Sequence, residues 1–368
     1  MTMNEKIKQT IDNYNPEKIR IGVLGSHSAL EIASGAKQEG FKTVGVGKPD
    51  RKATYDAYAA ATPDIYIEVN DWSEILTERV QQELIAHNTI MIPHGSFVEY
   101  VGLSNMIGGF YVPVLGNRST LEWESDRASQ RKWLLAAGLR LPKEYTSPDE
   151  IDRKIFVKFR GAKGGKGFFT ASSKKEFYQR MKERVQIGLV KAEDAEHFTI
   201  QEFLPGVRYY PHYFFSPLPN TVGYKVKNGT LIHMGFDKRI EPIDEAYRAL
   251  PDVPLEFMDY TITGNQRVTL RESLLPDIFK MGQGAVEAAQ ELIPPGIIGP
   301  FALETFYHPN TGFTVFEISG RIVAGTNPFG TGSEYSIWTY GKPVSTGRRI
   351  AMEIKSAIET KALDKIVS

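Results

Sequence analysis

The sequence of 368 residues contains no cysteine. Disulfide bonds, thiolate metal sites and cysteine nucleophiles are therefore excluded as sources of stability or chemistry. The N-terminal segment lacks the apolar core of a signal peptide, and no apolar run approaches the roughly 20 residues of a membrane-spanning helix. We therefore expect a cytoplasmic protein with no membrane partner.

The sequence also lacks a surplus of charge of either sign, because 44 Lys and Arg balance 44 Asp and Glu. A dedicated nucleic-acid-binding protein normally carries a basic surplus. The balance therefore argues against a nucleic-acid partner, although it permits a site that concentrates charge locally. At this length we expect two or three packed units.

Strands and helices alternate from Arg20 onward, which is typical of a parallel sheet covered on both faces. We place this first unit at residues 1–118. Its predicted strands are 19–25, 41–47, 64–69 and 88–95, and its predicted helices are 28–40 and 72–87.

Two further units follow, so the predicted fold class is mixed α/β and α+β. The second unit, residues 119–203, has predicted helices at 126–139 and 173–185 and predicted strands at 155–159, 167–172 and 197–204. The third unit, residues 204–368, is rich in strands, including one predicted at 268–273. It also contains predicted helices at about 272–292 and at 346–363.

The stretch FVKFRGAKGGKGFF at 156–169 places basic residues and glycines between two short apolar runs. It fits a solvated hairpin tip, a nucleic-acid patch or a loop that closes over a polyphosphate. Gly164, Gly165 and Gly167 would let backbone N–H groups approach phosphate oxygens, and Lys158 precedes them within a strand. The Walker-A spacing is absent, so this is not a P-loop nucleotide-binding motif.

Glu304 and Glu317 lie in two strand patterns, PFALETF and FTVFEIS, on either side of the turn HPNTG. A hairpin would bring the two carboxylates together, where they repel unless they share a proton or a cation. Oxygen ligands of this kind suit Mg²⁺ that bridges phosphates. The alternative is that each faces solvent, but Ser319 and Arg321 continue the strand as E-x-S-x-R and favour an anion and metal site.

Together these segments resemble the ATP-grasp superfamily over nearly the whole chain. The resemblance implies an N-terminal pre-ATP-grasp (Rossmann-like) domain, a small lid subdomain and a large subdomain that carries the metal carboxylates. It also implies ATP and Mg²⁺ (or Mn²⁺) as cofactors. The residues that match are the strand lysine Lys158, the glycines of the lid, the hinge residues Glu202, Phe203 and Leu204, and the metal ligands Glu304 and Glu317.

Longer segments resemble a more specific family, the archaeal formate-dependent AICAR ligases (FAICAR synthetases). That family implies ATP- and formate-dependent formylation of 5-aminoimidazole-4-carboxamide ribonucleotide (AICAR) in purine biosynthesis, through formyl phosphate. It also implies a homo-oligomer. The matching segments are GVLGSHSALEIASGAKQEGFKTVGV, MIPHGSFVEYVG, RYYPHYFFSP, TGNQRVTLRESLL and FEISGRIVAGTNPF.

Four further positions take their roles from this resemblance. His27, Ser96 and Asn265 are implied as contacts to AICAR, and Glu241 as an acidic residue on the ATP side. His27 also follows a predicted strand and precedes a predicted helix, so it lies near a helix N-terminus suited to anionic groups. We expect Arg321 to act with Lys158 in catalysis by holding formate or formyl phosphate.

Other functions compete with this interpretation. A ligase of another small carboxylate and another amine would keep the ATP residues, and a non-catalytic nucleotide-binding relative would not need both glutamates and Lys158. A dehydrogenase is excluded more simply, because GVLGSH is not the G-x-G-x-x-G fingerprint.

Overall fold

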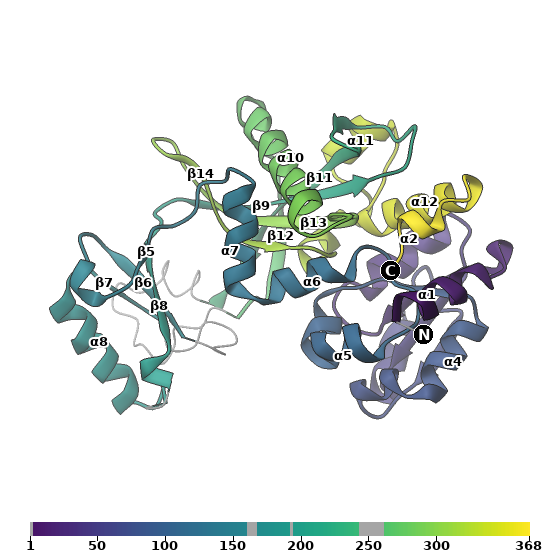
Figure 1. The fold of residues 1–368 in the computed structure, drawn as a ribbon, viewed down its shortest axis with the longest axis horizontal. Coiled ribbons are helices and arrows are strands. Elements are labelled where there is room, and N and C mark those ends of the chain that lie inside the picture. The colour runs from purple at the N-terminus through teal and green to yellow at the C-terminus, as the bar shows by residue number, and fades with distance from the viewer. Residues whose placement is uncertain (1–2, 160–167, 192–193, 243–260) are drawn as a thin grey trace.

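The computed structural model describes residues 3–159, 168–191, 194–242 and 261–368. These residues form three sheets (Figure 1). A lobe built on one small sheet lies at the left of the view, and the N-terminal unit lies at the right. The largest sheet lies between them.

The N-terminal unit is a parallel sheet with strand order β3-β2-β1-β4, as the alternating pattern predicted. Its strands are short apolar runs, and every residue of β2 is buried, as expected for a sheet covered on both faces. The strands are β1 (Arg20–Leu24), β2 (Thr43–Gly47), β3 (Ile65–Glu68) and β4 (Thr89–Met91). The helices are α1 (Met3–Asp12), α2 (Ala29–Gln38), α3 (Pro49–Asp56), α4 (Glu78–Ala86) and α5 (Leu103–Gly109).

The helix predicted at 72–87 is divided in the structure. A 3-10 helix at Trp72–Leu76 ends at Thr77, which has extended backbone angles and caps α4 through its side chain. Asp71 and Glu74 form a capping box at the start of the 3-10 helix. The apolar spacing alone predicts a single continuous helix, whereas the capping side chains divide it into two.

The small sheet is antiparallel, with strand order β5-β8-β6-β7. Ile155, Val157 and Phe159 of β6 are buried in one cluster with Phe177 of α8, so the alternate residues lie on the open face. The elements are β5 (Glu144–Tyr145), β6 (Ile155–Phe159), β7 (Phe169–Ala171), α8 (Lys174–Gln186) and β8 (Phe198–Glu202).

The large sheet is antiparallel, with order β10-β11-β9-β13-β14 and with β12 paired to β11. Its apolar face packs against α10 and α7. Its elements are β9 (Val207–Ser216), β10 (Tyr224–Val226), β11 (Gly229–Ile240), β12 (Gly264–Val268), α10 (Leu275–Leu292), β13 (Gly299–His308), β14 (Gly312–Ser319), α11 (Glu334–Tyr340) and α12 (Thr346–Glu359).

The strand predicted at 268–273 is misplaced, because β12 ends at Val268. The backbone N–H of Leu270 donates instead to the Tyr335 hydroxyl at 2.9 Å, and a 3-10 helix begins at Glu272. A tertiary contact with α11 therefore takes the place of the strand ladder.

Contacts of several kinds join the units. Helices α6 (Arg118–Ser125) and α7 (Arg127–Ala136) pack on the large sheet, where the Trp133 indole donates to the Ala285 carbonyl at 2.8 Å. The C-terminal helix α12 packs on α2 of the N-terminal unit (Figure 1). A parallel bridge pairs His94, beyond β4, with Ile322, beyond β14. The ends of these two strands therefore meet.

Among the described residues, no helix is both long and apolar enough to cross a membrane.

Candidate active site

The face of the large sheet opposite α10 is polar. In an antiparallel sheet, directly paired residues share a face, and residues two apart along a strand do so too. The registers therefore place side chains from five strands on one surface. These side chains are Arg208, Tyr210 and His212 of β9, Asp237 and Arg239 of β11, Asn265 of β12, Glu304 of β13 and Glu317 of β14.

Glu304 and Glu317 are paired directly across the β13–β14 hairpin, as the sequence predicted. The register shifts just beyond them, and this irregularity leaves Phe316 as the extra residue. The charge of Glu304, together with burial, raises the pKa of Glu317 to about 7. Two facing carboxylates are thus held where a cation or a proton would relieve their repulsion.

This pair fits the expected metal. No group of three or more metal-ligating side chains occurs within the described ranges. Magnesium in phosphate-binding sites commonly takes one or two protein carboxylates and completes its shell with phosphate oxygens and water. Glu304 also accepts a hydrogen bond from Arg239, so one of the two carboxylates already has a cationic neighbour.

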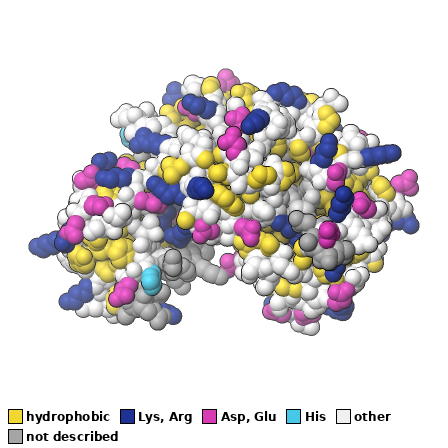
Figure 2. Space-filling view, viewed as in Figure 1, with side chains coloured by type: hydrophobic (Ala, Val, Ile, Leu, Met, Phe, Trp, Pro, Cys, Tyr) yellow, Lys and Arg dark blue, Asp and Glu magenta, His cyan; other side chains and the backbone are white. Residues whose placement is uncertain are grey.

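Lys158 and Glu317 line one cavity of about 500 Å³ between the small sheet and the large sheet. Glu317 is accessible to solvent from this cavity, although protein surrounds it on the other sides. Burial lowers the pKa of Lys158, and the negative charges of Glu317 and Glu304 oppose that shift. Lys and Arg side chains gather between the small lobe and the rest of the chain (Figure 2).

The hinge residues lie at the end of β8, beside this cavity. Thr199 and Gln201 of β8 line it. Glu202 forms an ion pair with Arg153 at 3.5 Å, and its N–H donates to the Lys143 carbonyl at 2.8 Å. The Phe203 N–H donates to the Lys154 carbonyl, and Leu204 is half-buried.

Glu241 directly follows β11 and is buried. Its carboxylate accepts from the Arg208 guanidinium at 2.6 Å. The lid glycines Gly164, Gly165 and Gly167 lie outside the described residues.

Arg321 lies two residues beyond β14. Its Nη2 is 3.0 Å from the carboxylate of Glu124, which also accepts from the Gly320 N–H at 2.8 Å. The buried Nε of Arg321 has no hydrogen-bond partner among the described residues. One edge of the guanidinium is therefore held by Glu124, which fixes the orientation of this cation at the end of β14.

His27 lies in the turn between β1 and α2, with a positive φ of 58°. Its ring stacks on His94 with a centroid distance of 5.4 Å. A Cβ at Gly95 would lie 3.0 Å from His27 Nε2 and 3.5 Å from the central guanidinium carbon of Arg321, so a glycine permits this close approach. The ring is open to solvent, but the surrounding protein and the nearby His94 and Arg321 lower the pKa of His27.

His94 is fully buried, and both of its ring nitrogens have partners. Nε2 lies 3.0 Å from the Leu24 carbonyl, and Nδ1 accepts from the Ser96 N–H at 3.3 Å. Burial lowers the pKa of His94 to about 4, so this ring is neutral at physiological pH. Ser96, itself buried, is thus bonded through its backbone to the ring on which His27 stacks.

Asn265 lies on β12 and pairs with Arg239 of β11. Its amide nitrogen donates to Asp237 at 2.7 Å. The 3-10 helix Ala324–Phe329 brings Asn327 near the His27 backbone, since its side-chain nitrogen lies 3.5 Å from that carbonyl oxygen.

Sequence reasoning missed Arg239, Glu124, His94 and Asp237. The segment FDKRIEP contains a usable signal, because Asp237, Arg239 and Glu241 alternate along one strand. Three charged residues two positions apart point to one face of a strand, and they follow the apolar run that begins the same strand, so the segment marks a polar face even though Lys238 lies between two of them. Glu124 gives no such signal, because its partner Arg321 lies in a distant part of the chain.

Comparisons with known proteins agree with this architecture. Residues 21–145 match the family described as "Protein of unknown function (DUF1246)", and residues 176–368 match "Domain of unknown function (DUF1297)". One relative is the 5-formaminoimidazole-4-carboxamide-1-(beta)-D-ribofuranosyl 5'-monophosphate synthetase of Korarchaeum cryptofilum. The two sequences are 47% identical, and the alignment covers the full length of both. This chain is 43% identical, again over both full lengths, to the protein of the same name from Methanocaldococcus jannaschii.

Two solved structures are similar to this chain. The IMP biosynthesis protein PurP from Thermococcus kodakaraensis is 30% identical and has a TM-score of 0.73, with 95% of this chain and 100% of that chain covered. The N5-carboxyaminoimidazole ribonucleotide synthetase from Thermotoga maritima is 14% identical and has a TM-score of 0.56, with 92% and 76% covered. At that identity the likeness concerns the fold alone, which is ATP-grasp, as the sequence predicted. The chain therefore belongs to the 5-formaminoimidazole-4-carboxamide-1-(beta)-D-ribofuranosyl 5'-monophosphate synthetase family and is an ATP-grasp ligase of purine biosynthesis.

Proposed function

We propose that this enzyme uses ATP and formate to formylate the amine of AICAR, giving FAICAR, ADP and phosphate. One observation carries the proposal. A single polar sheet face holds Glu304 and Glu317 beside the cavity lined by Lys158, and β14 then leads directly to Arg321 beside His27. A phosphate-activating region and an anion-binding region are thus adjacent.

The first step follows from the chemistry of formate, whose carboxylate lacks a leaving group. A formate oxygen attacks the γ-phosphorus of ATP, the bond to the β-phosphate oxygen breaks, and ADP leaves. Lys158 and Arg321 stabilise the negative charge on the transferring phosphoryl group and on formate. Glu304 and Glu317 would hold a Mg²⁺ or Mn²⁺ ion, which would supply further positive charge near the phosphate oxygens.

The second step consumes the resulting formyl phosphate. The amine nitrogen of AICAR attacks the formyl carbon, the carbon–oxygen bond to phosphate breaks, and the amine releases one proton. An aromatic amine is a weak nucleophile, so the rate depends on holding it against the formyl carbon. We assign this positioning to His27, Ser96 and Asn265. The lid glycines would exclude water that otherwise hydrolyses formyl phosphate.

ATP contacts are assigned by position. Glu202, Phe203 and Leu204 lie beside the cavity at the end of β8, where their backbone would meet the adenine edge. Glu241, held by Arg208, would face the ribose hydroxyls. We also propose that the enzyme is a cytoplasmic homo-oligomer with small-molecule substrates only.

Omission of each substrate in turn tests the function. With ATP and Mg²⁺, ADP release should require both formate and AICAR, and FAICAR should form in equal amount. ADP release that needs AICAR but accepts another carboxylate in place of formate would indicate a different ligase. Absence of any ADP release would indicate a non-catalytic nucleotide-binding protein.

A further inference from the structure

A buried hydrogen-bond chain fixes the carboxylate of Asp237 on the polar face. Asp237 is fully buried. One of its oxygens lies 2.7 Å from Nε2 of the buried His212, and the other accepts from the amide nitrogen of Asn265 at 2.7 Å. Nδ1 of His212 has no partner among the described residues. His212 therefore contacts Asp237 through Nε2, the ring nitrogen that donates to the carboxylate.

This chain determines which way the Asn265 amide points. An ionised carboxylate only accepts hydrogen bonds, so the Asn265 atom that faces Asp237 must be the nitrogen. The amide oxygen of Asn265 then points away from Asp237. Asn265 as a whole is only partly buried.

The backbone around Asp237 is shaped to keep this arrangement. A Cβ at Gly325 would lie 2.5 Å from one oxygen of Asp237 and 2.9 Å from the other, so a side chain there would displace the carboxylate. The same 3-10 helix carries Asn327, which lies beside the His27 backbone. The 3-10 helix that packs against Asp237 thus also contacts the turn that carries His27.

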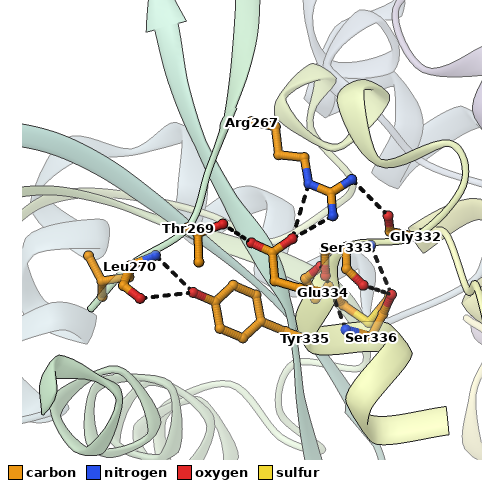
Figure 3. Close-up of polar contacts among 9 residues, drawn as sticks. Arg267, Thr269, Leu270, Gly332, Ser333, Glu334, Tyr335 and Ser336 are labelled. Carbon is orange, nitrogen blue, oxygen red and sulfur yellow. Dashed lines mark hydrogen bonds and ion pairs between the residues drawn. The ribbon is translucent and has the colours of Figure 1, made fainter. Parts of the chain in front are cut away.

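The strand that carries Asn265 is anchored at its other end. Figure 3 shows Glu334 of α11 accepting from Arg267 of β12 and from Thr269, and Tyr335 bonding the backbone of Leu270. The Arg267 Nε lies 3.1 Å from the Glu334 carboxylate. These contacts restrict sliding of β12, and so hold Asn265 opposite Arg239.

We propose that Asp237 is a specificity-determining positioning residue. It holds the Asn265 oxygen toward the N–H donors of the substrate's ring carboxamide, and so selects a carboxamide over a carboxylate at that ring position. A carboxamide nitrogen offers two N–H donors to the Asn265 oxygen. A carboxylate offers none, and its oxygens would repel the Asn265 oxygen. This inference rests on the proposed function, since it concerns the AICAR site.

The test compares two ribonucleotides that differ only in this group: AICAR, and the analogue with a carboxylate in place of the carboxamide. Direct binding and kcat/KM are measured for the wild type, Asp237→Asn, Asn265→Ala and the double variant. In Asp237→Asn, the new amide can donate to Asn265, which then turns its own nitrogen outward. We expect the preference for AICAR to fall about tenfold or more, with KM for ATP unchanged. Asp277→Asn makes the same chemical change on the exposed surface of α10 and should leave the preference unchanged.

The double variant separates positioning from a general structural role. If Asp237 acts through Asn265, the double variant loses no more preference than Asn265→Ala alone. Additive losses, or an unchanged preference in Asp237→Asn or in Asn265→Ala, would overturn the inference. Should Asp237→Asn fail to fold, Asn265→Ala still decides whether that amide sets the preference. Failure of the wild type to formylate AICAR would instead overturn the proposed function, which the omission assay reports separately.

Discussion

The carboxylates on the polar face of the large sheet have neighbours of opposite kinds. Glu317 faces Glu304, a like charge, and its pKa is raised to about 7. Asp237 lies between His212 and Asn265, which both bond it. Arg239 offsets the charge of the first pair only in part, so a further cation or a proton would complete it, whereas both oxygens of Asp237 have partners within the protein. We infer that the region around Glu304 and Glu317, assigned to the phosphates, reaches its stable charge state only when its ligands bind. The region around Asp237 and Asn265, assigned to the ribonucleotide, already has its hydrogen bonds in place before a ligand binds.

The largest effect is expected from Glu317→Gln. Loss of this carboxylate should lower kcat by about 10²–10³, because phosphoryl transfer depends on charge stabilisation. Stability should be unchanged or higher, because a repulsive pair is removed. Steady-state kinetics and thermal unfolding without divalent cations measure the two effects. Normal turnover by this variant would defeat the metal assignment.

The next effect is expected from Arg321→Ala, which leaves Glu124 without its ion-pair partner. Activity should fall about 100-fold, and stability should fall by about 3 kcal/mol, because a buried carboxylate loses its cation. The control is the double variant Glu124→Gln with Arg321→Ala, which should regain stability and not activity. Recovery of both properties would show that Arg321 has only a structural role.

The two regions should also differ in how stability depends on pH. The pKa of Glu317 is raised from 4.5 to about 7, so between pH 4.5 and pH 7 this group binds more protons in the folded protein than in the unfolded chain. Its contribution to stability therefore falls as the pH rises from 4.5 to 7. The pKa of His94 is lowered from 6.5 to about 4, so its contribution falls as pH drops below 6.5.

Unfolding free energies of the metal-free protein at several pH values test these opposite signs. Glu317→Gln should remove the loss of stability on the alkaline side, and His94→Gln should remove the loss on the acidic side. Identical pH profiles for both variants and the wild type would contradict both assignments.

The smallest effect is expected from Glu334→Gln, which weakens the anchor of β12. KM for AICAR should rise about two- to fivefold while KM for ATP stays constant, because the Arg267 contact is partly exposed and such pairs contribute little. An equal rise in both KM values would show that the anchor serves the whole sheet.

The sequence predicts those parts of the fold and site that depend on local pattern. The hairpin pairing of Glu304 with Glu317 follows from a turn between two strand patterns, and the parallel N-terminal sheet follows from alternating elements. The Glu124–Arg321 pair and the His27–His94 stack could not be predicted, because their members come from separate elements that only tertiary packing brings together. The roles of Gly164, Gly165 and Gly167 stay predictions.

The central claim is that formate is activated by phosphorylation before the amine attacks. Formate labelled with ¹⁸O in both oxygens tests it directly, with ATP, AICAR and Mg²⁺ and the released phosphate examined by mass spectrometry. The proposed mechanism transfers one formate oxygen to each phosphate, because that oxygen joins phosphorus in the first step and leaves with it in the second. Phosphate that carries no ¹⁸O while FAICAR forms would contradict the formyl phosphate route.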